Sequence, residues 1–128
     1  TRPWQHVIEP LAAYLCLAER LWADPAHAGA YNFGPLSHEA ATVGYVVKMA
    51  SSAYPESATS YENHSKGPHE AGWLALETAH ARQALGVAPR WGLTTAVERT
   101  MAWYRAQQGG ADARALCLAD LNAWEATA

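Results

Sequence analysis

The chain has 128 residues, half of them hydrophobic, and a formal net charge of −3 at pH 7. This length and composition predict one compact domain with its own core. The lysines and arginines are spread out rather than clustered, so we expect no nucleic-acid partner. No apolar run approaches the ~20 residues of a membrane span, so we expect no membrane partner either.

The chain begins at Thr1 without an initiator methionine, which we interpret as the middle of a longer protein. An upstream portion could then hold a targeting segment. Cys16 and Cys117 lie far apart and match neither a metal-ligand pair nor a secreted disulfide framework. We therefore expect two buried thiols in a protein of the reducing cytoplasm.

The first residues place a cation and an aromatic side chain, Arg2 and Trp4, directly before a predicted helix. A guanidinium fork and a helix N-terminus both favour negatively charged oxygen atoms. The arrangement therefore indicates a phosphate-bearing ligand. The alternative is a solvated arginine beside a tryptophan of the core.

A helix is predicted from Pro10 to the stop at Asp24-Pro25, since proline suits a first helical turn. Its apolar residues recur at helical spacing and predict one buried stripe: Leu11, Tyr14, Leu15, Ala18, Leu21 and Trp22. A short buried strand is expected over residues 30–33, ended by a turn at Gly34-Pro35.

The middle of the chain alternates helical and extended patterns. A helix over residues 43–54 has Thr42 as its cap. Residues 59–64 are typical of a strand or a loop, and residues 65–70 form a turn-rich loop of the kind that often carries ligand contacts. A further short strand is predicted over residues 73–76.

Three helices are expected in the last third of the chain. The first is capped by Thr78, runs through Leu85 and is closed by Gly86 in the left-handed conformation. The second is capped by Thr94 and ends at residues 107–110. The third covers residues 118–124 and has weak boundary signals.

No motif for catalysis or cofactor binding is visible in these residues. Gly29, Gly34 and Gly44 do not form the glycine-rich strand-to-helix turn of a dinucleotide site, and no tyrosine has a lysine four residues after it. His64 and His69 are the closest histidine pair but lack metal-ligand spacing. We predict no catalytic, cofactor-binding or metal-binding residue in this chain.

Six sequence blocks nevertheless occur in a familiar order: Arg-Pro-Trp-Gln-His-Val at 2–7, Tyr-Asn-Phe-Gly-Pro at 31–35, Gly-Pro-His-Glu-Ala at 67–71, Ala-Leu-Gly at 84–86, Pro-Arg-Trp at 89–91 and Met-Ala-Trp-Tyr at 101–104. With them the chain resembles the C-terminal part of CDP-glucose 4,6-dehydratases, within the extended short-chain dehydrogenase/reductase family of nucleotide-sugar enzymes. The resemblance covers nearly the whole chain. The first block is closest to the CDP-glucose branch, whereas the later blocks are shared across the family.

This resemblance implies an α/β fold for residues 1–128, a single substrate-binding unit with several helices and a few short strands. Some of these strands would complete a sheet begun upstream. The N-terminal Rossmann domain, with bound NAD and the catalytic tyrosine and lysine, is absent from this chain. The unit alone is expected to be inactive. Relatives commonly associate, so a homo-oligomer is a possible assembly.

The resemblance also implies a lyase of deoxysugar and lipopolysaccharide biosynthesis. In such enzymes NAD takes hydride from sugar C4, water leaves across C5 and C6, and the hydride returns to C6. CDP-glucose thereby becomes CDP-4-dehydro-6-deoxyglucose. The alternatives are another nucleotide-sugar epimerase or reductase of the family, or a non-catalytic binding or assembly module.

Four residues are candidates for substrate binding by this resemblance. Arg2 matches the arginine that grips the nucleotide diphosphate. His69 matches a loop histidine near the same phosphates, and Glu70 follows where an acidic residue is usual, although a solvated loop pair is an equal alternative. Asn32 matches an asparagine for which securing the adjacent turn is the favoured alternative. Gly72 replaces a larger residue, which leaves the nucleotide or sugar preference open.

Overall fold

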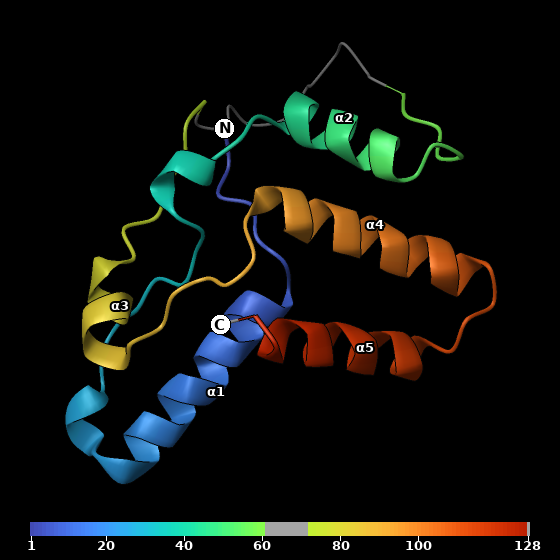
Figure 1. Ribbon diagram of the computed structural model, residues 1–128. Helices are drawn as coiled ribbons and strands as arrows, with labels where there is room; N and C mark the ends of the chain where they lie inside the picture. Colours follow the sequence, from blue (N-terminus) through green and yellow to red (C-terminus); the bar gives the residue numbers. More distant parts are fainter. Residues whose placement is uncertain (61–71, 128) are drawn as a thin grey trace.

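The structure, a computed structural model, describes residues 1–60 and 72–127. Helices dominate this part of the chain (Figure 1). Its elements are α1 (Ile8–Ala23), the 3-10 turns η1 (Pro25–His27) and η2 (Ser37–Glu39), α2 (Val43–Ala53), α3 (Ala79–Leu85), α4 (Leu93–Gln108) and α5 (Ala113–Glu125). None of these helices is long and apolar enough to cross a membrane.

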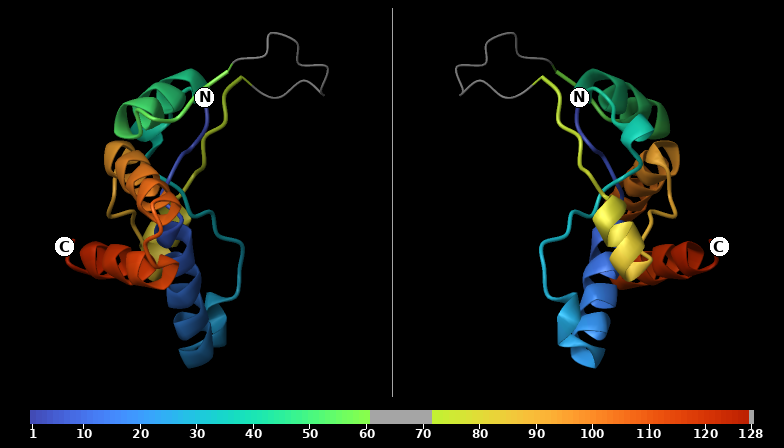
Figure 2. Two further views of the ribbon diagram at one scale, coloured as in Figure 1. Left: turned by 90° about the vertical axis from the view of Figure 1, so that its right-hand side faces the viewer. Right: turned by 90° about the vertical axis from the view of Figure 1, so that its left-hand side faces the viewer.

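The helices form two neighbouring groups. Helix α4 lies between α2 and α5 and packs against both, while α1 packs against η1 and α3 (Figure 1). Extended segments link the two groups, and the first residues of the chain run beside the segment that leads into α3 (Figure 2). This arrangement brings the N-terminal residues into contact with two other parts of the chain.

The predicted α/β character is correct only for the helices. The described residues contain a single isolated antiparallel bridge, between Arg2 and Ala41, and no strand at residues 30–33 or 73–76. Those two predicted strands are wrong here, although both segments lie outside helices. An extended segment becomes a strand only when a neighbouring backbone satisfies its N–H and C=O groups, which an alternating sequence cannot supply by itself.

Two predicted helix boundaries are confirmed. The Thr42 Oγ1 accepts a hydrogen bond of 3.2 Å from the backbone N–H of Tyr45 and caps α2. Gly86 ends α3 with φ of 69°, a left-handed conformation that glycine adopts without a Cβ penalty. Both signals are local in sequence and therefore readable from it.

The predicted cap of α3 is correct in position, whereas that of α4 is wrong. Thr78 is the N-cap residue of α3, but its side chain makes no capping hydrogen bond; the Glu77 carboxylate accepts from the N–H of Ala79 instead. Helix α4 begins at Leu93 rather than after Thr94, and Leu93 donates its N–H to Glu39 Oε1 at 3.3 Å. Glu39 lies on η2, so this partner is invisible to a search for local caps.

Two other helices begin earlier than predicted. Helix α1 already starts at Ile8, with Pro10 in its first turn. Helix α5 starts at Ala113, where Asp112 Oδ2 accepts from the N–H of Ala115 at 2.8 Å. An aspartate is a preferred N-cap residue, so Asp112 was an available signal.

The buried core is small and differs from the predicted one. Its hydrophobic members among the described residues are Ala13, Ala41, Ala81, Leu85, Trp91, Ala96 and Val97. The apolar stripe of α1, predicted to be buried, is largely exposed, with Leu15 at 73% and Trp22 at 93% of full exposure. The cysteines also differ from expectation, since Cys117 is exposed and Cys16 is half-buried.

Candidate functional site

The first residues of the chain are fixed by hydrogen bonds on two sides. Arg2 and Ala41 exchange backbone hydrogen bonds of 2.9 and 3.1 Å. On the other side, the Thr1 nitrogen donates to the Gly72 carbonyl at 2.7 Å, and the Leu74 N–H donates to the Thr1 carbonyl at 3.1 Å. We call residues 1–4, 41 and 72–74 the N-terminal seam.

The seam holds the two residues that drew attention in the sequence. Arg2 is half-buried, and its Nη1 donates to the Thr1 carbonyl at 2.9 Å. Trp4 is also half-buried, and its indole Nε1 donates to the Ala41 carbonyl at 3.1 Å. The Arg2 backbone and the Trp4 indole therefore both bind the backbone of Ala41.

Two of the four candidate binding residues, His69 and Glu70, lie outside the described residues. The description resumes at Gly72, whose carbonyl accepts the hydrogen bond from Thr1. Thr1, the neighbour of Arg2, therefore contacts the segment that follows these two candidates.

The fourth candidate, Asn32, ties two extended segments together. Its Nδ2 donates to the Glu77 carbonyl at 3.2 Å, and Gln5 Nε2 donates to the neighbouring Phe33 carbonyl at 3.1 Å. These bonds fix the segment around residues 32–33 to the start of the chain and to the approach to α3. The Asn32 amide thus has a structural partner on a distant segment rather than in the adjacent turn.

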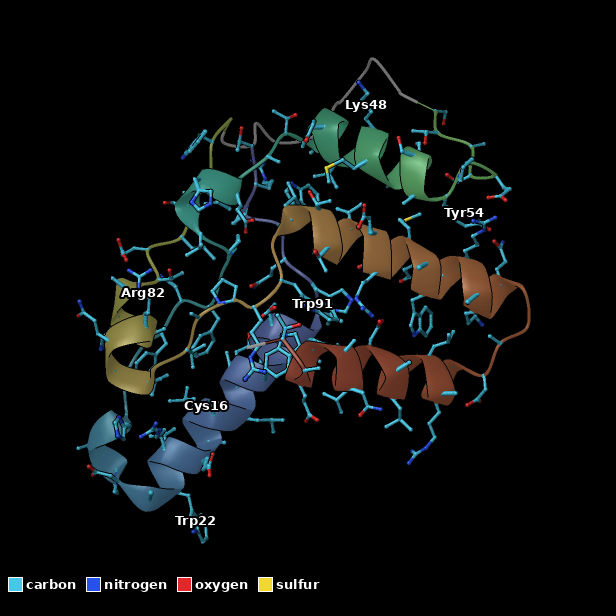
Figure 3. The ribbon with its side chains drawn as sticks, viewed as in Figure 1. Cys16, Trp22, Lys48, Tyr54, Arg82 and Trp91 are labelled. Atoms are coloured by element: carbon cyan, nitrogen blue, oxygen red, sulfur yellow. The ribbon has the colours of Figure 1, made fainter. Side chains whose placement is uncertain are left out.

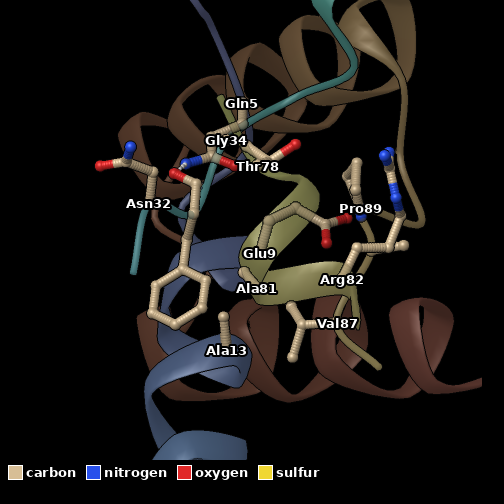
Figure 4. Close-up of a pocket in the computed structure, with 12 residues that line it drawn as sticks. Gln5, Glu9, Ala13, Asn32, Gly34, Thr78, Ala81, Arg82, Val87 and Pro89 are labelled. Atoms are coloured by element: carbon tan, nitrogen blue, oxygen red, sulfur yellow. Dashed lines mark hydrogen bonds between the residues drawn. The ribbon is translucent and has the colours of Figure 1, made fainter. Parts of the chain in front are cut away.

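Asn32 also lines a small cavity between α1 and α3 (Figure 4). The polar groups around it come from Gln5, Glu9, Thr78 and Arg82, and its volume of ≈ 20 Å³ is room for about one water molecule. Arg2 is not among its lining residues. The structure therefore does not bring Arg2 and Asn32 together in this cavity.

A second polar site, which the sequence did not predict, surrounds the buried carboxylate of Glu9. Its Oε1 accepts three hydrogen bonds: from the Trp91 N–H at 2.8 Å, the Trp124 Nε1 at 2.9 Å and the Arg90 N–H at 3.1 Å. These donors come from the loop before α4 and from α5. Glu9 thus joins the first helix to the last, because a buried carboxylate is tolerated only when hydrogen-bonded.

The Arg90 side chain binds the C-terminal end of α5. Its guanidinium lies 4.0 Å from the centre of the Trp124 ring, and its Nη1 donates to the carbonyls of Trp124, Glu125 and Thr127 at 3.2–3.4 Å. These carbonyls lie at a helix C-terminus, where a cation is favourable. We call His6, Glu9, Arg90, Trp91 and Trp124 the Glu9 hub.

His6 completes the hub at the start of α1. Its ring meets the Trp91 ring edge-on at 4.9 Å, and its Nδ1 accepts from the N–H of Ile8 at 3.3 Å. Burial lowers the pKa of His6, the nearby carboxylates of Asp120 and Glu9 act in the opposite direction, and Arg99 adds to the lowering. The imidazole is accordingly neutral at pH 7.

The hub joins α1, the loop before α4 and α5 through hydrogen bonds. Arg99 stacks on the other side of Trp91, 4.8 Å from its ring centre, and pairs with Asp120 at 3.0 Å. Glu9, Arg90 and Arg99 therefore each bind a group on another element. A lone glutamate at the start of an apolar helix is usually a favourable first-turn charge, so the sequence carried no signal for this role.

The described part of the chain shows neither a dinucleotide-binding turn nor a metal site. In the described segments, neither Gly29 nor Gly34 lies in a turn that leads from a strand into a helix, and Gly44 lies inside α2. The same segments contain no cluster of three or more histidine, cysteine, aspartate or glutamate side chains able to hold a metal ion. Residues 1–60 and 72–127 therefore offer neither a phosphate-binding turn for a dinucleotide nor a metal-ligand set.

Comparison with known proteins identifies one clear relative. No protein-family model matches the chain. The chain is 38% identical over 112 residues, 87% of its length, to the CDP-glucose 4,6-dehydratase of Salmonella typhimurium (strain LT2). It spans 31% of that enzyme's length. The resemblance inferred from the six sequence blocks is confirmed, and it concerns about a third of the relative.

Proposed function

We propose that this chain is the nucleotide-sugar-binding, C-terminal part of an NAD-dependent CDP-glucose 4,6-dehydratase. The carrying observation is the 38% identity over 87% of the chain to an enzyme of that name. In this proposal NAD and the catalytic residues belong to a part of the protein outside this chain. When bound there, NAD supplies the reversible hydride transfer that makes the loss of water from the sugar possible.

Arg2 is the residue proposed to bind the substrate diphosphate. Its backbone is paired with Ala41 and its peptide neighbour Thr1 with Gly72 and Leu74, so the side chain extends from a fixed point. A planar guanidinium can meet two phosphate oxygens at once, which a lysine cannot. His69 and Glu70 join the proposal through the sequence alone, since they lie just before Gly72.

The reaction itself is tested with the full-length product of the gene that encodes this chain. Incubation with CDP-glucose and NAD should convert the substrate to CDP-4-dehydro-6-deoxyglucose, detected by mass spectrometry as the loss of one water. Residues 1–128 alone should give no product. Absence of product from the full-length protein would overturn the proposed activity.

Arg2→Lys tests the proposed phosphate contact in the same enzyme. A charge-assisted hydrogen bond contributes about 1.5–3 kcal/mol, so we expect KM for CDP-glucose to rise about 10–100-fold with a smaller change in kcat. Arg114→Gln is the control, since Arg114 is exposed on α5, away from the N-terminal seam. Equal KM values for the two variants would remove Arg2 from the site.

A second candidate, another nucleotide-sugar enzyme of the same family, is favoured by one observation. By the resemblance, Gly72 replaces a larger residue; it lies in the seam beside Thr1, and an added Cβ there would meet no other described atom within 4 Å. Calorimetric titration of the full-length protein with CDP, UDP and dTDP discriminates, and we expect CDP to bind most tightly.

A further inference from the structure

The buried carbonyl of Ala41 accepts two hydrogen bonds from the start of the chain. The Arg2 N–H donates to it at 2.9 Å, and the Trp4 indole Nε1 donates to it at 3.1 Å. A carbonyl oxygen has two lone pairs, so these two donors use its full capacity. Ala41 is only 8% exposed, so water has little access to replace either donor.

Pro3 makes the connection between these two donors stiff. Its ring fixes its own φ near about −65°, and it restricts the preceding residue, Arg2, to extended conformations. A displacement of the Trp4 ring is therefore transmitted to the Arg2 backbone rather than absorbed between them.

Ala41 is itself held in place by its neighbours in sequence. Glu39 Oε1 accepts from the N–H of Leu93 at the start of α4, at 3.3 Å. Thr42 Oγ1 accepts from the N–H of Tyr45 in the first turn of α2, at 3.2 Å. The turn over residues 39–42 is thus fixed to two helices, and the Trp4 indole binds the start of the chain to this turn.

We propose that Trp4 is a positioning residue for the diphosphate of the substrate and acts through Arg2. The indole N–H holds the same carbonyl that holds the Arg2 backbone, so the guanidinium extends from a defined point. Without the indole bond, more conformational freedom of Arg2 must be lost when the diphosphate binds, which weakens binding. This inference rests on the proposed function, in which Arg2 binds the diphosphate.

Hydrogen exchange of the full-length protein without substrate tests the anchor. The Arg2 and Ala41 N–H groups donate to each other's carbonyl, so both exchange when this pair opens. We expect Trp4→Phe to speed their exchange about three- to tenfold, since it removes one hydrogen bond. The control is Trp22→Phe, because Trp22 is 93% exposed and projects away from the rest of the chain (Figure 3). Equal exchange in the two variants would overturn the proposal.

Steady-state kinetics with CDP-glucose and NAD test whether Trp4 acts through Arg2. Trp4→Phe should raise KM about three- to tenfold and change kcat by less than about twofold. In an Arg2→Lys background the same substitution should change KM by less than about twofold, because the contact that it positions is already lost. Two effects on KM that simply multiply would overturn the proposal. A fall in kcat at unchanged KM would also overturn it, since a merely structural loss reduces the amount of folded enzyme.

The two experiments separate the positioning role from the proposed function. Hydrogen exchange needs neither CDP-glucose nor NAD. Faster exchange in Trp4→Phe, with no dehydratase activity of the unsubstituted protein, would contradict the proposed function and support the anchor. Dehydratase activity with unchanged exchange in Trp4→Phe would contradict the positioning role alone.

Discussion

Helix α1 has an inner face that carries Glu9 and an outer face that carries Leu15 and Trp22. The burial of these two faces is the opposite of what the hydrophobicity of their side chains predicts. The inner face buries a carboxylate, Glu9, and satisfies it with three hydrogen bonds from the loop before α4 and from α5. The outer face presents leucine, tyrosine and tryptophan to solvent. Burial along this helix therefore follows the availability of hydrogen-bond partners rather than the hydrophobicity of the side chain.

The largest expected effect on stability is that of Glu9→Ala, which tests the inner face of α1. The substitution leaves three N–H donors without their acceptor, so we expect a loss of about 3–5 kcal/mol in the free energy of unfolding, measured by urea denaturation of the full-length protein. Glu19→Ala, at an exposed position of the same helix, should change stability by less than about 0.5 kcal/mol. Similar losses for both variants would mean that the inner face is not held through Glu9.

A pair of glycine substitutions tests how far the inner network extends along the chain. At Gly92, beside Trp91 of the hub, a Cβ would collide with the Glu39 carboxylate that caps α4. We expect Gly92→Ala to cost about 1–2 kcal/mol. Gly44→Ala is the matched control in α2, where a Cβ meets nothing within 4 Å and helix propensity should add about 0.5–1 kcal/mol of stability. If Gly92→Ala left the free energy of unfolding unchanged, the Glu39 cap of α4 would not contribute to the stability of the network around Glu9.

The smallest expected effect is the pH dependence that His6 gives to the inner face. Burial lowers the pKa of His6 below its ordinary value of 6.5, so the unfolded chain binds the proton more tightly than the folded one. The contribution of His6 is present above about pH 6.5 and is lost as the pH falls toward the lowered pKa. Thermal unfolding between about pH 7.5 and about 5.5 should show less acid destabilisation in His6→Gln than in the exposed control His38→Gln.

The helices were predictable because their signals are local. Thr42 and Gly86 act within one turn of the helices that they bound, and both acted as predicted. The start of α4 was not predictable, because its capping group, the Glu39 carboxylate, comes from a distant 3-10 turn. The predicted strands failed for a similar reason, since an extended segment needs a pairing partner that the segment itself does not specify.

The candidate site was predictable only to the level of individual residues. The opening block drew attention to Arg2, and the structure anchors Arg2 between Ala41 and the segment that begins at Gly72. The partner of Asn32, the Glu77 carbonyl, could not be predicted because it lies 45 positions away along the chain. The Glu9 hub escaped notice because each of its donors is more than eighty positions away along the chain.

Those long separations have a consequence for synthesis on the ribosome. Trp124 donates to a carboxylate 115 residues earlier, and Trp91 to the same carboxylate 82 residues earlier. Because translation proceeds from the N-terminus, α1 emerges long before the groups that complete its inner face. The Glu9 carboxylate therefore lacks one of its three donors until Trp124 has been synthesised, so a stop codon before position 124 would weaken the start of α1 as well as removing the end of α5.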